Sequence, residues 1–395
     1  MVKAIQKKRL LWVVPEVKDG GIRTYSQALW PSIKESWRSR GFETLEPYFL
    51  DEKEFPKLLD YLKKERPTYI HFQHEYGLFG GKNPLRYSFP KWVSKIRDIL
   101  PEAYLSATAH TVLDPDFRYA WRGWSPQDQV KWWGNFTWLP FVRGMWMKKT
   151  WGVLDGVVVH SSYQQPAVIK SDCHHVEVIP HFVFDPKQAM GGVPVPRNRH
   201  PILEQSKDAS LVMVFGFFTP EKGQDVAIRA WAESPLRERG NVRLILAGGV
   251  RRPEDRPYYD QCVKLIQDLG LSDRVQITGF LPADSMDSFF EACKLVLAPF
   301  RATSGSGSLA QALARGTPIL ASDLLLNREI VEREPGALSF FESLNAADCA
   351  RKVCELLDQE EARAKLREAA RKYAEGLKPA RVAEKHADFY LKLTT

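Results

Sequence analysis

Residues 303–318 combine small polar side chains with the start of a predicted helix, a pattern that can bind phosphate. The residues of interest in this segment are Ser304, Gly305, Ser306, Gly307 and Gln311. Bare backbone N–H groups and hydroxyls at a helix N-terminus favour a phosphate group, and Gln311, one or two turns further on, could reach a ribose. The segment lacks the GxxxxGK[ST] pattern of P-loops, so hydrolysis of a nucleoside triphosphate is not indicated.

A lysine near a second helix start supplies positive charge for such a site. Lys222 follows a predicted strand and Gly216, and it directly precedes the next helix. In that place its ammonium can hold a diphosphate as a point charge. Gly249 and Phe280 follow two further predicted strands. Because ligands collect at the carboxyl ends of strands in doubly wound sheets, we expect both residues in the same cleft.

Two glycines in the first half of the chain mark another possible anion site. Gly20 and Gly21 follow the first predicted strand, at residues 9–14, and lead into a helix. Paired glycines let the backbone approach a ligand closely, and the helix N-terminus behind them favours an anion. The alternative is a tight turn that only reverses the chain. The pair is not GxGxxG, so the dinucleotide-binding fingerprint is absent.

Polar side chains also end two later strands. Gln73 and Glu75 are two positions apart, so along a strand their side chains point to the same face, and the side chain of His74 points to the opposite face. These three either contact a ligand in the cleft or form a buried hydrogen-bond network, and their spacing lacks the third ligand that zinc requires. His110, at the tip of the next strand, is placed for proton transfer or for polarising a substrate. A structural histidine is the alternative.

The segment at residues 119–151 differs sharply from the rest of the chain. It holds seven of the twelve tryptophans, together with several lysines and arginines. Aromatic and basic residues on helical segments resemble a membrane-interface surface or a carbohydrate platform. The alternative is that the rings fill a core between domains. An anionic membrane surface is therefore one candidate partner of this segment.

Alternating strands and helices must position these residues. Short apolar runs recur between helix-like stretches, which is typical of parallel sheets covered on both faces. The expected strands are 9–14, 69–73, 104–109, 156–159, 176–179, 211–215, 242–247, 275–278, 295–298 and 318–321, and the expected helices include 55–65, 224–233, 258–269 and 286–293. This order predicts two doubly wound α/β units. The aperiodic, Gly- and Pro-containing stretch 186–201 separates them, and Pro379 breaks the last helical region.

Composition excludes several classes of protein. With 395 residues, 44% of them hydrophobic and 26% charged, the chain is an ordinary globular protein of about two domains. Five scattered cysteines without a CxxC pair offer neither a disulfide framework nor a zinc knuckle. The net charge of +8 favours anionic partners, but no nucleic-acid-binding motif is present. No apolar run approaches ~18–20 residues, so we expect a cytoplasmic protein, with peripheral attachment to the inner face of the membrane left open.

In their order and spacing these segments resemble the GT-B glycosyltransferases of family four, which are retaining enzymes that use nucleotide sugars. The branch with a QHE(Y/F)G-type segment is the most similar, on the residues Gln73, His74 and Glu75. The resemblance implies two Rossmann-like doubly wound parallel-sheet domains that face a central cleft. The implied divisions are an acceptor-side domain at 1–188, completed by a C-terminal helix at 379–395, a linker at 189–206, and a nucleotide-sugar-binding domain at 207–378.

The resemblance also implies a reaction. A sugar passes from a nucleotide-diphosphate sugar to a glycan or a lipid-linked acceptor, as in polysaccharide biosynthesis, by a same-face displacement that needs no protein nucleophile and no metal or other cofactor. Lys222 and the helix start at 304–307 would neutralise the leaving diphosphate. His110 would orient the sugar near the anomeric carbon. Glu329 stands where members of the family often have a glutamate.

Three positions depart from the common pattern of the family. Thr303 and Gln311 stand where many members carry two glutamates, and Phe217 stands where an arginine often lies beside the diphosphate. These departures motivate an alternative, a non-catalytic protein that binds nucleotide sugars or glycans on the same fold. Release of nucleoside diphosphate from a panel of donors separates the two hypotheses.

Overall fold

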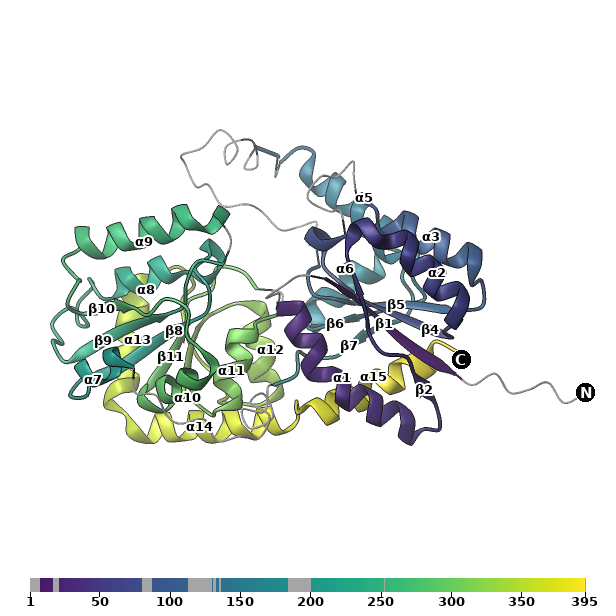
Figure 1. Cartoon of the computed structure of the whole chain (residues 1–395). Helices are drawn as coiled ribbons and strands as arrows, with labels where there is room; N and C mark the ends of the chain where they lie inside the picture. Colours follow the sequence, from purple (N-terminus) through teal and green to yellow (C-terminus); the bar gives the residue numbers. More distant parts are fainter. Residues whose placement is uncertain are drawn as a thin grey trace, which may run out of the picture. The chain divides into compact units, whose positions relative to one another are not determined.

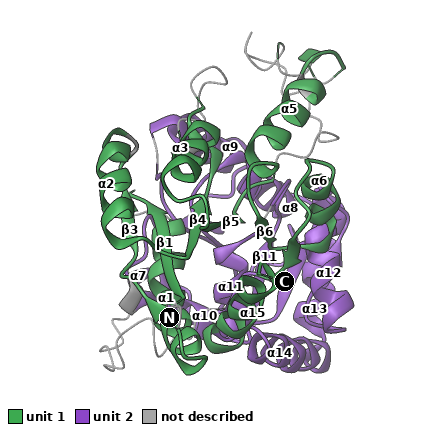
Figure 2. Ribbon diagram, turned by 90° about the vertical axis from the view of Figure 1, so that its right-hand side faces the viewer, with its two compact units in different colours: residues 1–180, 379–395 green, residues 181–378 purple. Residues whose placement is uncertain are grey.

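The computed structural model describes residues 8–16, 21–79, 87–112, 130, 133–134, 136–183, 200–251, 253–303 and 305–394. The chain divides into two compact units (Figure 2). The first unit comprises residues 1–180 and 379–395, and the second comprises residues 181–378. Each unit is a parallel sheet covered by helices.

The first unit is built on a seven-stranded parallel sheet (Figure 1). The strand order is β2-β1-β4-β5-β6-β7, and β3 pairs with the far end of β1. The strands are β1 Arg9–Pro15, β2 Glu43–Thr44, β3 Tyr48–Leu50, β4 Tyr69–His74, β5 Tyr104–Ala109, β6 Gly156–Val159 and β7 Val176–Val178. The helices are α1 Gly21–Ser39, α2 Phe55–Glu65, α3 Phe89–Ile99, α5 Leu139–Trp151, α6 Gln165–Ile169 and α15 Pro379–Lys392.

Alternation along the strands decides which layer each side chain joins. Phe72 of β4 packs in the core that α2, α3 and α5 cover. His71, its neighbour in the strand, points to the other face, and its ring lies 5.7 Å from that of His386 on α15. Trp12 of β1 points the same way, and its Nε1 donates to Tyr390 Oη of α15 at 3.0 Å. The last helix of the chain therefore covers the first sheet, together with α1.

The second unit is built on a six-stranded parallel sheet with the order β10-β9-β8-β11-β12-β13. The strands are β8 Ser210–Phe215, β9 Val242–Ala247, β10 Val275–Ile277, β11 Leu295–Ala298, β12 Ile319–Ser322 and β13 Ser339–Phe341. The helices are α7 Pro201–Gln205, α8 Gln224–Ala230, α9 Arg256–Asp268, α10 Ala283–Ala292, α11 Gly307–Ala314, α12 Leu325–Arg333, α13 Ala346–Asp358 and α14 Glu360–Glu375. Its core joins Val212 and Leu244 of the sheet to Trp231, after α8, and Val353 of α13.

The prediction of two doubly wound parallel sheets is confirmed. Strands β5, β6, β9 and β11 begin and end at the predicted residues. Strands β2, β3 and β13, of two or three residues each, were not predicted, and β2 consists of Glu43 and Thr44, neither of them apolar.

The division of the chain differs from the expected one at the linker. Residues 181–183, expected in the first domain, belong to the second unit, where the Val183 N–H donates to the Leu377 carbonyl at 2.8 Å. Residues 201–205, expected in the linker, form helix α7 of the second unit. The first part of the expected linker, at 189–199, lies outside the described residues.

Candidate functional site

Lys222 lies at the carboxyl edge of the second sheet, as the last residue of a 3-10 turn between β8 and α8. Its ammonium donates to Ser306 Oγ at 3.1 Å and to Ser308 Oγ at 2.9 Å, both at the start of α11. The same nitrogen lies 4.0 Å from the ring centroid of Phe300, which follows β11. Two loops that are about eighty residues apart in the chain therefore meet at one cation.

The charge of Lys222 is surrounded by hydroxyl groups. Among the described residues Lys222 forms no ion pair, and the adjacent Glu221 acts on it through charge alone. Loss of hydration lowers the pKa of Lys222 to about 8, against the opposing effect of Glu221. A partly dehydrated cation without a carboxylate partner favours an incoming anion, because the anion restores the charge balance.

The N-terminus of α11 adds further groups that favour an anion. Ser306 is its N-cap, and its Oγ accepts a hydrogen bond from the Leu309 N–H at 3.2 Å. Gly307 begins the helix, and a Cβ at that position would have no atom of the described part of the chain within 4 Å. The Gly305 N–H donates to Thr303 Oγ1 at 3.3 Å, so the preceding loop folds back on itself. The positive end of the helix dipole thus lies beside the ammonium.

Two predicted glycines lie where the loops approach each other closely. Gly216 has φ +130°, and a Cβ there would lie 3.5 Å from Ser308 Oγ and 3.8 Å from Lys222 Cε. A Cβ at Gly249 would lie 3.1 Å from the Phe280 nitrogen. The structure therefore brings Gly216 beside the lysine, and it brings Gly249 beside the loop that follows β10.

Phe217 and Phe280 form an aromatic pair at the same edge. Their rings are stacked, with centroids 6.3 Å apart and an interplanar angle of 21°. Phe280 is 71% exposed, and the Arg251 guanidinium lies 5.5 Å from the Phe217 centroid. Arg251 was not predicted as a site residue, although its place just after Gly249 at a strand tip was a usable signal. The flat exposed ring can accept a planar or apolar group of a ligand.

An ion-pair network holds the turn that carries the lysine. Arg301 makes two bonds to the Asp225 carboxylate, at 2.7 and 2.5 Å, and Tyr258 Oη donates to the same carboxylate at 2.6 Å. Arg301 Nη1 also donates to the Pro220 carbonyl, and its backbone N–H donates to the Glu221 carbonyl, each at 2.8 Å. The network fixes the 3-10 turn against the loop after β11. Its members are too far apart in sequence for spacing to have revealed it.

Gln311 and Glu329 are held by arginines of their own helices. Gln311 Oε1 accepts from Arg315 Nη1, and Arg315 Nη2 also pairs with Asp287 at 2.6 Å. The buried Glu329 pairs with Arg333 one turn later in α12. A ligand contact through either side chain would have to displace or share its arginine. The predicted contact of Gln311 with a ribose stays a prediction.

In the first unit, three predicted residues form a polar cluster at the carboxyl edge of the sheet. His110 Nε2–H donates to Gln73 Oε1 at 2.9 Å, and Thr111 Oγ1 donates to Glu75 Oε2 at 2.6 Å. The Tyr25 ring of α1 lies edge-on to His110, with centroids 4.9 Å apart. Gln73 Nε2 is buried and has no hydrogen-bond partner among the described residues. Gln73 and Glu75 thus each have a partner in the segment that follows β5, and the Gln73 amide keeps a donor available.

His74 is a core residue, and its placement in the cleft was wrong. It is fully buried, between Phe79 at 5.3 Å and Phe89 at 4.7 Å, and its Nε2 bonds to Tyr87 Oη at 2.7 Å. Burial lowers the pKa of His74 to about 3. The cause is the parity that separates it from Gln73, because alternate residues of β4 face opposite layers.

Gly21 is the first residue of α1, and a Cβ at that position would meet no atom of the described residues within 4 Å. Gly20 and Ser304, the remaining predicted site residues, lie outside the described residues. Within the described ranges no three His, Cys, Asp or Glu side chains gather as a metal site requires. No helix of the described part is long and apolar enough to span a membrane.

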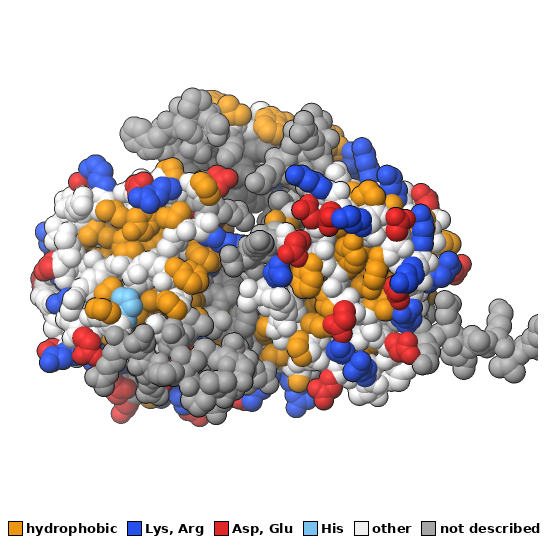
Figure 3. All heavy atoms as spheres, viewed as in Figure 1, with side chains coloured by type: hydrophobic (Ala, Val, Ile, Leu, Met, Phe, Trp, Pro, Cys, Tyr) orange, Lys and Arg blue, Asp and Glu red, His pale blue; other side chains and the backbone are white. Residues whose placement is uncertain are grey.

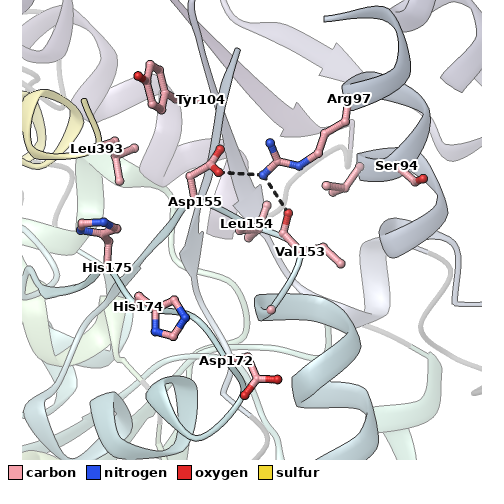
Figure 4. A pocket seen from close by; sticks show the side chains of 12 residues that line it. Ser94, Arg97, Tyr104, Val153, Leu154, Asp155, Asp172, His174, His175 and Leu393 are labelled. Atoms are coloured by element: carbon pink, nitrogen blue, oxygen red, sulfur yellow. Dashed lines mark hydrogen bonds and ion pairs between the residues drawn. The ribbon is translucent and has the colours of Figure 1, made fainter. Parts of the chain in front are cut away.

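A cavity of about 570 Å³ lies at the other edge of the first sheet (Figure 4). It opens where Tyr104 begins β5 and Asp155 precedes β6, so it faces the amino ends of the strands. Arg97 points into it from α3 and donates to Asp155 Oδ1 at 2.8 Å and to the Val153 carbonyl at 3.1 Å. None of the residues predicted from the sequence lines this cavity.

The chain is similar to known proteins in its sequence and in its fold. Residues 197–373, which lie in the second unit, match the family model of the glycosyl transferases group 1. A D-inositol 3-phosphate glycosyltransferase of Nocardia farcinica is 32% identical over 120 residues, which make up 29% of this chain and 25% of that protein. The chain spans between 25% and 44% of the length of the first curated relatives that it matches.

Two solved structures extend the likeness to nearly the whole chain. HepE of Anabaena, in complex with UDP and glucose, has a TM-score of 0.69 at 15% identity and covers 98% of this chain and 100% of its own. Sucrose-phosphate synthase of Thermosynechococcus elongatus has a TM-score of 0.70 at 17% identity, and the match covers 98% of this chain and 99% of that protein's chain. At 15% and 17% sequence identity, the structural likeness establishes the fold alone. The chain has the GT-B fold, and its second unit carries the match to the group 1 glycosyl transferases.

Proposed function

We propose that this protein is a retaining glycosyltransferase of family four that moves a sugar from a nucleotide-diphosphate sugar to a glycan or lipid-linked acceptor. The observation that carries the proposal is the ammonium of Lys222, which lies at the N-terminus of α11 between two serine hydroxyls and forms no ion pair among the described residues. A diphosphate fits this arrangement, because its charge and acceptor oxygens satisfy the cation, the hydroxyls and the helix dipole together.

In the proposed reaction the bond between the anomeric carbon and the β-phosphate oxygen breaks, and the acceptor oxygen bonds to the same carbon on the same face. The acceptor proton passes to the departing phosphate, and nucleoside diphosphate leaves. Lys222 stabilises the charge that develops on the leaving diphosphate, which is the main electrostatic task. We propose that His110, held by Gln73, orients the sugar or acceptor, and that no metal is required.

The stacked Phe217 and Phe280 add a surface for the planar part of the donor in the second unit. HepE, whose fold this chain shares, was solved with UDP and glucose, which supports a nucleotide sugar as the donor class. The alternative, a non-catalytic protein that binds nucleotide sugars or glycans, rests on Thr303, Gln311 and Phe217, which differ from the common pattern of the family.

Incubation of the purified protein with a panel of UDP-, GDP- and ADP-sugars tests the proposal. One donor is expected to release nucleoside diphosphate, and release is expected to accelerate when a matching glycan or lipid-linked acceptor is added. Binding of a nucleotide sugar in calorimetry without any release, across the donor and acceptor panel, would favour the non-catalytic alternative. Neither binding nor release would contradict both.

The affinity for nucleoside diphosphate is expected to fall as the pH rises through about 8. The pKa of Lys222 is about 8 in the free protein, and a bound diphosphate raises this pKa. At a pH between the free and the bound pKa, Lys222 must therefore take up a proton when the diphosphate binds. The dissociation constant of UDP, or of the base that the panel selects, should therefore rise up to about tenfold from pH 8 to pH 9. Calorimetry from pH 7 to pH 9.5 measures it, and the Lys222→Arg variant should show a flat profile. An equal slope in that variant would assign the proton to another group.

A further inference from the structure

Helix α5 divides the tryptophan-rich segment into a buried side and an exposed side. On the inner side Met147 and Trp151 are buried in the core of the first unit. Trp146 stacks on the Tyr87 ring with centroids 5.6 Å apart, and Thr150 Oγ1 donates to Tyr87 Oη at 3.0 Å. These residues belong to the first unit's own core, whereas the expectation was a core between domains, and the helix is firmly held against its unit.

The outer side of the same region exposes large apolar side chains. The exposed fractions are 63% for Trp133, 67% for Phe136, 48% for Trp138, 75% for Phe141 and 37% for Met145. The last three are spaced three and four residues apart, so they form one stripe along the helix. Figure 3 shows hydrophobic side chains at the surface along the upper rim, where Figure 1 places α5. Apolar patches of this kind mark interaction sites.

Basic side chains continue the stripe. Lys148 and Lys149 are exposed in the last turn of α5, Arg143 is buried, and residues 136–151 contain no Asp or Glu. Lys148 pairs with Asp172 at 2.7 Å, but both side chains are more than half exposed, so water and salt screen the pair and it holds Lys148 only weakly. The positive charge of the surface is thus available to an anionic partner.

We propose that this face of α5 docks on the surface of an anionic lipid bilayer, with Trp138, Phe141 and Met145 in the interface and the lysines against the headgroups. Indole rings prefer the boundary between headgroups and acyl chains, and lysines flanking an apolar stripe favour anionic lipid. At thirteen residues α5 is too short to cross the bilayer, which takes about 20. The proposal does not depend on the proposed sugar transfer.

Vesicle flotation of the full chain tests the proposal without any donor or acceptor. The wild-type protein is expected to float with vesicles of phosphatidylcholine and 30% phosphatidylglycerol, to float poorly with phosphatidylcholine alone, and to lose binding in 0.5 M NaCl. The double variant Trp138→Ser/Phe141→Ser should bind about tenfold or more weakly. Both side chains are exposed, so its thermal unfolding should match that of the wild type.

Leu325→Ser is the matched control, because Leu325 is a 62% exposed apolar residue on α12 of the second unit. It should leave flotation unchanged. A wild-type protein that stays at the bottom of the gradient, or a double variant that floats as well as the control, would overturn the proposal. Sedimentation velocity without lipid tests whether a second copy of the protein binds to this face instead. A wild-type dimer that the double variant converts to monomer, together with no flotation, would assign the face to self-association instead.

Discussion

Replacement of Lys222 with methionine is expected to lower kcat/KM for the donor by about 10²–10³-fold. Loss of a single preorganised donor to a developing oxyanion costs about that much, and Lys222 is the cation between the two serine hydroxyls and the start of α11. Methionine keeps an apolar chain of similar length over the Phe300 ring, so the packing of the loop is preserved. The release of nucleoside diphosphate measures the rate, and calorimetry measures the accompanying loss of affinity.

Lys264→Met is the control for loss of a positive charge from the same unit. Lys264 lies on α9, is 72% exposed and pairs with Asp268 at 2.6 Å within one turn of its helix. Its replacement should leave both the rate and the affinity unchanged. A Lys222→Met variant with full activity and unaltered affinity would remove the lysine from the site, and with it the observation on which the proposed function rests.

The layers of both units were predictable because apolar runs and helix-like stretches alternate along almost the whole chain. Strand β9, at Val242–Ala247, is apolar at most positions, which is typical of a strand covered on both faces. The two-residue strand Glu43–Thr44 has no such pattern and forms only because β1 offers it a free edge. Its existence depends on a neighbour that is distant in sequence, and local periodicity contains no information about that neighbour.

Whether a residue's position along a strand is odd or even predicted the face to which its side chain points better than the polarity of the side chain did. His74 and Gln73 are both polar and adjacent, and both were placed in the cleft. The structure buries His74 among aromatic rings and puts Gln73 beside His110, because β4 presents alternate residues to opposite faces. The tryptophan-rich segment follows the same logic with a helical period, since Trp151 is buried while Trp138 is 48% exposed.

The supporting residues of the site could not be predicted from spacing. Arg301 and Asp225 are 76 positions apart, and their contact exists because β8 and β11 are neighbours in the sheet. Ser308 lay inside the segment that was singled out, yet its contact with Lys222 depends on the same strand order. The motifs singled out Lys222 and the start of α11, and only the topology showed what holds them.

Replacement of Gly223 with alanine is expected to lower the free energy of unfolding of the second unit by roughly 3–5 kcal/mol. Gly223 joins the lysine turn to α8 with φ +67°, a left-handed conformation that costs a non-glycine residue about 1–2 kcal/mol. A Cβ at this position would lie 1.9 Å from the Pro299 carbonyl oxygen, and this neighbour is backbone at the end of β11. Because that backbone cannot rotate aside as a side chain can, the two loops must separate.

Gly270 separates the two causes. Its φ of +65° matches that of Gly223, but none of the atoms that the structure describes lies within 4 Å of where its Cβ would be. Gly270→Ala should therefore cost only about 1–2 kcal/mol, and the difference between the variants measures the collision with Pro299. Chemical denaturation followed by fluorescence provides both values. Equal costs would mean that the loops yield freely, and the lysine turn would then not be fixed by its close contact with β11. If Gly223→Ala is instead strongly destabilised and Gly270→Ala is not, the loops have separated. Separation of the loops draws Lys222 away from Ser306 and Ser308, so the Gly223→Ala protein that remains folded should also bind nucleoside diphosphate more weakly.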